Sequence, residues 1–238
     1  MHVPTKRAER TFIKICGLTN EDDALAAAEA GADFLGFVFY PKSPRYVTPE
    51  TVARIVETVR ATYGADAPRF VGVFVDETPE RVRAILDTAG LDLAQLHGSE
   101  PPAEVRMLAP RAFKAIRPQT RGDAEATTAA YAHVIPREAH LPQFLMDAYH
   151  PWEVGGTGIV ADWAVGLVLA RSYRLLLAGG LTPETVGAAI ARVQPWGVDV
   201  SSGVEREKGR KDHARLRAFV EAVRTANVAL AEQQTDQE

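Results

Sequence analysis

The chain has 238 residues, of which 46% are hydrophobic and 24% charged, and its formal net charge at pH 7 is −4. Such a composition is typical of a globular protein with one large domain or two small ones, and its acidic balance argues against a dedicated nucleic-acid-binding protein. Charges, glycine or proline interrupt every long apolar stretch, and the first ten residues lack an apolar core, so we expect no transmembrane helix and no signal peptide.

The chain contains one cysteine, Cys16, which excludes an internal disulfide and a cysteine zinc site. We therefore expect a cytoplasmic globular protein that is cofactor-independent or binds a small molecule, with no membrane or nucleic-acid partner.

Short β-rich runs alternate with longer helical segments along the whole chain. Eight runs are predicted as strands: Phe12–Cys16, Phe34–Phe39, Phe70–Val75, Leu91–His97, Ala112–Ile116, Gln143–Asp147, Arg174–Ala178 and Gly197–Ser201. This alternation is typical of βαβ units around a parallel sheet. Eight units in a chain of this length predict an α/β protein with a single-domain (β/α)8 barrel over residues 11–226. The polar tails, residues 1–10 and 229–238, are expected to be frayed.

Helix-start signals support this division. The segment Thr19–Asp22 precedes a helix predicted over Ala24–Ala30, which Gly31 ends. Thr-Pro-Glu triplets that begin at Thr48, Thr78 and Thr182 precede three more predicted helices: Val52–Thr62, Val82–Thr88 and Val186–Val193. In each triplet the hydroxyl is a capping group, the proline needs no amide hydrogen, and the glutamate lies near the positive end of the helix dipole.

A doubly wound open sheet is the alternative architecture. It requires a glycine-rich nucleotide-binding turn after an early strand. The residues that follow the first predicted strand, Cys16–Thr19, lack that pattern. The sequence therefore favours the barrel.

In a (β/α)8 barrel the active site lies at the carboxyl ends of the strands, so polar residues and glycines there are candidate site residues. These residues, which we expect to line one mouth, are Cys16, Arg45, Gln95, His97, Asp147, Gly179, Gly180, Asp199, Ser201, Ser202 and Gly203.

Two glycine-containing turns indicate a phosphate site. Gly179–Leu181 follows the seventh predicted strand and Ser201–Gly203 follows the eighth, where such barrels commonly bind phosphate. Glycines let backbone N–H groups approach an anion, and a helix N-terminus adds a favourable dipole. A third turn, Gly155–Gly158, is placed to close over the same group. Each turn alone is also explained as a tight connection, whereas their joint placement favours phosphate binding.

Cys16 has two interpretations. A free cysteine is often a buried, inert hydrophobic residue, but as a thiolate it is a base or a nucleophile. Strand alternation places Lys14 on the same face as Cys16. We hypothesise that Lys14 lies inside the barrel below the thiol, paired with Asp199 or Asp147, because an unpaired buried ammonium is costly.

The remaining polar candidates also have two interpretations each. Asp147 is either a cap or loop residue, or a general acid across the mouth from Cys16. Arg45 is either an ordinary exposed arginine or a bidentate clamp for a carboxylate. His97 is a structural histidine, a catalytic residue or a residue that contacts the ligand.

The segment Lys14–Thr19 reads Lys-Ile-Cys-Gly-Leu-Thr. This segment resembles the opening strand and loop of the phosphoribosylanthranilate isomerases of tryptophan biosynthesis. Further similar segments follow in the family's order: Gly31–Asp33, Gly36–Phe39, Ser43–Tyr46, Val71–Val75, Gln95–Gly98, Leu145–Asp147, Gly155–Gly158, Asp162–Trp163, Ala178–Leu181, Val198–Glu205 and Gly209–Asp212. Together they span residues 11–225.

The resemblance implies an Amadori rearrangement of a small phosphosugar substrate, N-(5-phosphoribosyl)anthranilate. It assigns the general acid to Asp147, the general base to Cys16 and the substrate carboxylate to Arg45. The phosphate-binding residues it implies are Gly156, Gly179, Gly180, Ser201, Ser202 and Gly203, with support from Lys14, Gln95, His97 and Asp199. The protonated imine is the electron sink of this reaction, so the resemblance implies no metal, nicotinamide or pyridoxal.

The chain departs from the family pattern at Ile159, where many members carry lysine, and in the segments Ala139–Phe144 and Ala148–Val154. Two other functions are considered. A related barrel of histidine biosynthesis performs the same type of rearrangement, but that type has an aspartate after the first strand. A non-catalytic barrel that binds a phosphorylated ligand would need the mouth but no acid and base. The sequence leaves open whether the protein is a monomer or a homodimer.

Overall fold

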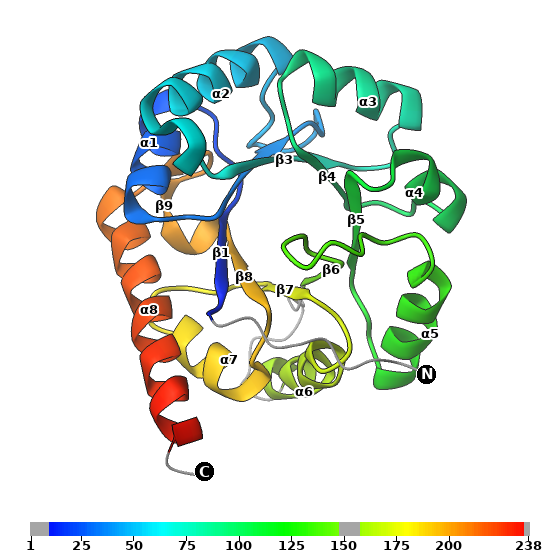
Figure 1. The fold of residues 1–238 in the computed structure, drawn as a ribbon, viewed down its shortest axis with the longest axis vertical. Coiled ribbons are helices and arrows are strands. Elements are labelled where there is room, and N and C mark those ends of the chain that lie inside the picture. The colour runs from blue at the N-terminus through cyan, green and yellow to red at the C-terminus, as the bar shows by residue number, and fades with distance from the viewer. Residues whose placement is uncertain (1–9, 148–157, 236–238) are drawn as a thin grey trace.

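The computed structural model describes residues 10–147 and 158–235. Eight parallel strands form a closed barrel in chain order, in which the last strand pairs with the first (Figure 1). Their bounds are β1 Phe12–Ile15, β2 Phe34–Val38, β3 Arg69–Phe74, β4 Leu93–Leu96, β5 Ala112–Ile116, β6 Phe144–Asp147, β7 Leu175–Ala178 and β8 Gly197–Val200. The barrel prediction is confirmed, and the predicted strand ends are correct to within two residues.

Helices surround the barrel on its outside (Figure 1). They are α1 Glu21–Ala30, α2 Pro49–Tyr63, α3 Pro79–Thr88, α4 Pro102–Leu108, α5 Arg121–Tyr131, α6 Gly158–Ala170, α7 Val186–Val193 and α8 His213–Thr235, with a short 3-10 turn, η1, at Gly64–Asp66. The strand–helix alternation inferred from the sequence is therefore complete around the ring.

The predicted helix starts hold for three helices and differ at the fourth. The side chains of Asn20, Thr48 and Thr78 each accept a hydrogen bond from a backbone N–H in the first turn of α1, α2 and α3. Helix α7 begins at Val186 as predicted, but Thr182 does not cap it. The hydroxyl of Thr185 instead accepts a hydrogen bond from the N–H of Thr182 at 3.0 Å, so residues 182–185 form a turn of their own before the helix.

The C-terminal helix extends into the segment that was expected to be a frayed tail. Residues 229–235 were expected to be frayed but are the last turns of α8, while residues 1–9 and 236–238 lie outside the described residues. Helix α8 packs against α1 and α7, and Ala226 and Leu230 contact the core. The Oδ1 atom of Asn227 accepts a hydrogen bond from the N–H of Thr11 at 3.1 Å. These contacts keep the end of the helix on the barrel.

Successive side chains on each strand point alternately outward and inward, so the core side chains form two groups. Outward residues such as Ile13 and Ile15 pack against the helices. Inward residues fill the amino-terminal end of the barrel, where Phe12, Phe34 and Trp196 contact one another. Because this end is closed by aromatic rings, the polar inward residues gather at the carboxyl end.

A short hairpin follows β8 and was not predicted. It consists of a 3-10 turn, η2, at Ser202–Val204, and the antiparallel strands β9 at Glu205–Glu207 and β10 at Arg210–Lys211. In the described part of the chain, no helix combines the length and the apolar character that a membrane span requires.

Candidate active site

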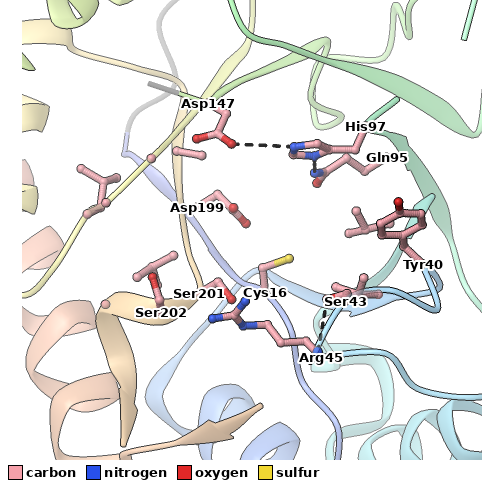
Figure 2. A pocket seen from close by; sticks show the side chains of 18 of the residues that line it. Cys16, Tyr40, Ser43, Arg45, Gln95, His97, Asp147, Asp199, Ser201 and Ser202 are labelled. Carbon is pink, nitrogen blue, oxygen red and sulfur yellow. Dashed lines mark hydrogen bonds and ion pairs between the residues drawn. The ribbon is translucent and has the colours of Figure 1, made fainter. Parts of the chain in front are cut away.

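A cleft of about 480 Å³ opens at the carboxyl ends of the strands. Its lining includes these predicted site residues: Cys16, Arg45, Gln95, His97, Asp147, Gly179, Gly180, Asp199, Ser201, Ser202 and Gly203. Figure 2 shows Cys16, Asp147 and Arg45 projecting into it from different sides. Lys14 lies below the lining, and Gly156 is outside the described residues.

Cys16 follows β1 and lies beside a buried ion pair. Lys14 on β1 is the register partner of Asp199 on β8, so both side chains point into the barrel. The Lys14 Nζ atom is 2.6 Å from Asp199 Oδ1, and the Lys14 side chain is fully buried. On the other side, a Cβ atom at Gly36 would lie 2.9 Å from Cys16 Sγ and 3.1 Å from Lys14 Nζ. A glycine on β2 is thus required for the thiol and the amine to approach this strand.

The charged neighbours of Cys16 have opposite effects on the pKa of its thiol. Burial is the largest influence and raises the pKa of the Cys16 thiol, Asp199 raises it further, and Lys14 lowers it. Burial alone would lower the pKa of Lys14, but Asp199 and Cys16 outweigh burial and raise it. Lys14 is therefore a permanent cation next to a thiol that burial keeps protonated.

Asp147 ends β6 and faces two nitrogen-bearing side chains. Its Oδ2 atom lies 3.8 Å from His97 Nε2 and 3.6 Å from Arg117 Nε. The Nδ1 atom of His97 is 2.7 Å from Gln95 Nε2. Because an amide nitrogen only donates hydrogen bonds, Nδ1 is the acceptor, and a neutral His97 carries its proton on Nε2, toward Asp147. Gln95, which is buried, thereby fixes the tautomer of His97.

Arg117 is a site residue that the sequence analysis missed. It directly follows β5 and lines the cleft, as does Asp147 at the end of β6. The search for polar residues at strand ends omitted the fifth strand, and the same rule applied there would have found Arg117.

Arg45 lies at the cleft but is already paired. Its Nε and Nη2 atoms each donate to a carboxylate oxygen of Glu205 at 2.6 Å. Glu205 is on the hairpin that was not predicted, so this pair was not foreseen.

The turns after β7 and β8 lie against each other. Gly179 and Gly180 have φ values of +96° and +67°, which favour glycine. A Cβ atom at Gly203 would collide with the carbonyl oxygen of Leu181. Within residues 10–147 and 158–235, the amide N–H groups of Gly180, Ser202 and Gly203 are not donated to any protein acceptor. The two turns thus present backbone donors of the kind that bind an anion.

The fold and the cleft together define a (β/α)8 barrel with a cleft at the carboxyl ends of its strands, which is where enzymes of this fold have their active sites. The family described as N-(5'phosphoribosyl)anthranilate (PRA) isomerase matches residues 13–222. The chain therefore belongs to this family, whose members are isomerases of tryptophan biosynthesis.

Individual relatives agree with the family match. The N-(5'-phosphoribosyl)anthranilate isomerase of Roseiflexus castenholzii is 50% identical over 218 residues, which cover 90% of this chain and 99% of that protein. That of Geobacter sp. strain M21 is 46% identical over 213 residues, which cover 88% of this chain and 96% of that protein.

Solved structures agree as well. The phosphoribosyl anthranilate isomerase of Thermotoga maritima superposes with a TM-score of 0.78 at 39% identity, covering 90% of this chain and 99% of that one. A second isomerase structure, in complex with reduced 1-(o-carboxyphenylamino)-1-deoxyribulose 5-phosphate, has a TM-score of 0.74 at 37% identity with the same coverage.

Proposed function

We propose that the chain converts N-(5-phosphoribosyl)anthranilate into 1-(2-carboxyphenylamino)-1-deoxyribulose 5-phosphate, with Asp147 as general acid and Cys16 as general base. The observation that carries this proposal is one cleft that receives a thiol from the end of β1 and a carboxyl from the end of β6 (Figure 2). The glycine turns beside them suit the phosphate of the same substrate.

Ring opening is the first step. Asp147 donates its proton to the ring oxygen of the ribose while the bond between C1 and that oxygen breaks. The lone pair of the anthranilate nitrogen forms the C1=N bond, which leaves a protonated imine. A positioned acid of this kind typically accelerates a step by about 10²–10⁴-fold.

Proton transfer from C2 is the second step. The Cys16 thiolate takes this proton, the C–H electrons form the C1=C2 bond, and the imine π electrons return to nitrogen. The Asp147 carboxylate then takes the O2 proton of the enol and C1 takes the proton held by Cys16, which gives the isomeric ketose and returns both groups to their starting states. The positive imine beside Sγ opposes the burial that raises the pKa of Cys16, so bound substrate itself favours the thiolate.

The other groups bind and orient the substrate. The N–H groups of Gly180, Ser202 and Gly203, which have no protein acceptor among the described residues, suit the phosphate oxygens, and Gly179 and Ser201 belong to the same turns. Gly156 lies outside the described residues and is assigned to the same phosphate on the family resemblance alone. Arg45 suits the anthranilate carboxylate. Asp199 and Lys14 set the charge below the sugar, while His97, which Gln95 contacts from behind, faces Asp147.

The test is the loss of fluorescence of freshly prepared N-(5-phosphoribosyl)anthranilate in the presence of the protein. We expect turnover by the wild type and a fall of about 10²-fold or more in kcat for Cys16→Ala and for Asp147→Asn. Calorimetry with the reduced product analogue should show that both variants still bind, which separates an enzyme from a barrel that only binds ligand. Full turnover by both variants would refute the assigned acid and base.

A further inference from the structure

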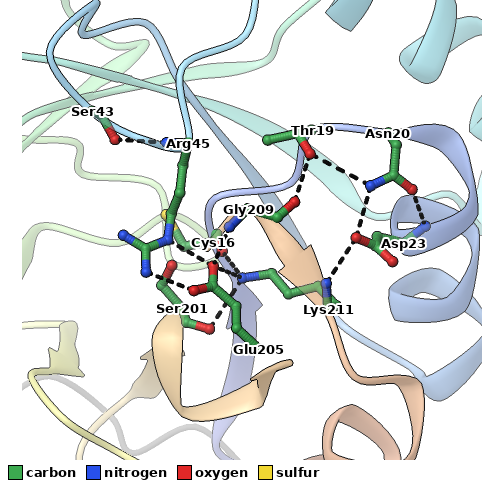
Figure 3. Close-up of polar contacts among 10 residues, drawn as sticks. All are labelled: Cys16, Thr19, Asn20, Asp23, Ser43, Arg45, Ser201, Glu205, Gly209 and Lys211. Carbon is green, nitrogen blue, oxygen red and sulfur yellow. Dashed lines mark hydrogen bonds and ion pairs between the residues drawn. The ribbon is translucent and has the colours of Figure 1, made fainter. Parts of the chain in front are cut away.

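The segment from Glu205 to Asp212 carries a family motif for which the proposed reaction gives no role. It forms the β9–β10 hairpin beside Cys16 and Arg45 (Figure 3). Two of its side chains, Glu205 and Lys211, are buried and charged, and both point toward the cleft residues rather than toward solvent.

Glu205 fixes one edge of the Arg45 guanidinium. Its two oxygens accept from Nε and Nη2, each at 2.6 Å, and only 5% of its side chain is exposed. Within the described residues Nη1 makes no hydrogen bond. The edge formed by Nη1 and the second N–H of Nη2 is therefore free, and this edge has the geometry that binds a carboxylate with two parallel hydrogen bonds.

The aliphatic part of Arg45 is equally restricted. It crosses Gly17 so closely that a Cβ atom there would lie 2.5 Å from Arg45 Cδ. Gly17 has a φ of +75°, a conformation that favours glycine. Arg45 is thus held at both its chain and its head group.

Lys211 joins Glu205 to the ends of two barrel strands. Its Nζ atom donates to the carbonyl oxygen of Cys16 at 2.6 Å, to that of Ser201 at 3.1 Å and to Glu205 Oε1 at 3.1 Å. These three acceptors use all three donors of the amine. The backbone N–H of Lys211 donates to Asp23 Oδ2 at 2.9 Å, which anchors the hairpin to the start of α1.

The ionisation of Glu205 agrees with this arrangement. Burial alone would raise the pKa of its carboxyl, but Arg45 and Lys211 outweigh burial and lower it. The carboxylate therefore stays negative and keeps its two bonds to Arg45 at neutral pH.

We propose that Glu205 and Lys211 are positioning residues, which hold the free edge of Arg45 toward the cleft so that it selects substrates with an ortho carboxylate on the aromatic amine. The inference rests on the proposed function. Lys211 acts on Arg45 through Glu205 and, by its bond to the Cys16 carbonyl, keeps the thiol and the guanidinium in a constant relative position.

The test compares two substrates, N-(5-phosphoribosyl)anthranilate and N-(5-phosphoribosyl)aniline, which lacks the carboxylate. The readout is the ratio of their kcat/KM values, hereafter the carboxylate preference. Hydrogen bonds to a charged group contribute about 1.5–3 kcal/mol, so we expect Glu205→Gln to lower the preference by about tenfold or more, through KM. Glu205→Asp, which keeps the charge, should retain more of the preference than Glu205→Gln.

A double-variant comparison shows whether Glu205 acts through Arg45. Arg45→Met alone should abolish most of the preference, and adding Glu205→Gln should lower it no further. Glu100→Gln is the matched control, because it also disrupts a buried acid–lysine pair, Lys114 Nζ to Glu100 Oε2 at 2.9 Å, without touching Arg45. The control should leave the preference at the wild-type value.

Lys211→Met tests the second residue, with folding checked by circular dichroism. We expect a lower carboxylate preference and a lower kcat, and Lys211→Arg replaces it if the methionine variant does not fold.

An active wild type whose preference survives Glu205→Gln would overturn this inference and leave the proposed reaction standing. A wild type with no turnover of either substrate would instead overturn the proposed reaction.

Discussion

At the scale of single residues, the chemistry of Cys16 depends on which charges its neighbours carry. Lys14 and Asp199 flank it from inside the barrel, and Lys211 and Arg45 lie nearby at its carboxyl side. Burial raises the pKa of the thiol and the lysine cations lower it, so each cation favours the thiolate that the proposed base requires.

Replacing Lys14 should therefore change the pH dependence of the reaction. In Lys14→Met the cation that lowers the pKa of the Cys16 thiol is lost, so this pKa rises further. The acidic limb of kcat/KM, which reports loss of the thiolate, should move to higher pH, and kcat/KM at pH 7 should fall by about tenfold or more. The matched control is Lys114→Met, since Lys114 is also buried but pairs with Glu100 outside the cleft. A limb that moves equally in both variants would contradict this account.

The position of the proton on His97 depends on its neighbour Gln95. The Gln95 amide donates to Nδ1, which leaves the proton on Nε2, toward Asp147. A carboxylate at position 95 would accept from Nδ1 and reverse the tautomer. We expect Gln95→Glu to lower kcat by about tenfold with a smaller change in KM, whereas Gln95→Met should reduce kcat less. Steady-state kinetics of the two variants test this, and a more active glutamate variant would exclude the tautomer argument.

At the scale of elements, the turns after β7 and β8 function as a pair. Gly203 lies so close to the Leu181 carbonyl that any side chain must separate the two turns. Gly203→Ala should thus weaken phosphate binding, raising KM by about tenfold or more while kcat changes less, because about one to two charged hydrogen bonds are lost. Gly187→Ala on α7 is the control, since a Cβ there meets nothing within 4 Å. Inhibition by inorganic phosphate gives an independent measure, and unchanged inhibition of Gly203→Ala would argue against this cradle.

The eight strands and the helices α1, α2, α3 and α7 were predictable because each has a local signal. Apolar runs mark the strands, and the Thr-Pro-Glu triplet at Thr48 marks the start of α2, whose cap forms as expected. The β9–β10 hairpin has no such signal, because its short strands consist of charged residues that bury no alternating apolar face. Its charged side chains pair with residues that are distant in the chain: Glu205 accepts a hydrogen bond from Arg45, which is 160 residues away. Sequence analysis therefore identified Arg45 as a site residue but not the carboxylate that orients it.

The partner of Lys14 is another feature of the cleft that the sequence alone could not determine. Strand parity correctly put Lys14 on the inside, and it pairs with Asp199, one of the two partners that were considered. The choice between Asp199 and Asp147 required the register of β1 on β8, which a single sequence does not contain.

At the scale of the whole molecule, the aromatic residues that stabilise the barrel interior and the residues that line the cleft lie at opposite ends of the barrel. The aromatic contacts of Phe12, Phe34 and Trp196 close the amino-terminal end, whereas the cleft occupies the carboxyl end. Changes at the closed end should thus alter unfolding without altering turnover.

The last turns of α8 provide a test of this separation. The family match ends at residue 222, yet the helix continues to Thr235, with Leu230 on the core and Asn227 bonded to Thr11, the buried residue that precedes β1. Removing residues 226–238 leaves the N–H of Thr11 without its protein partner, at a cost of about 1–3 kcal/mol, in addition to the lost apolar contact of Leu230. Each kcal/mol lowers the Tm of a chain of this size by about 2–4 °C. Calorimetry should show a lower Tm, while kcat and KM at 25 °C stay within about twofold of the full chain. Asn227→Ala should reproduce part of the fall in Tm, and a truncated chain with normal Tm but impaired turnover would show that α8 contributes to the cleft instead.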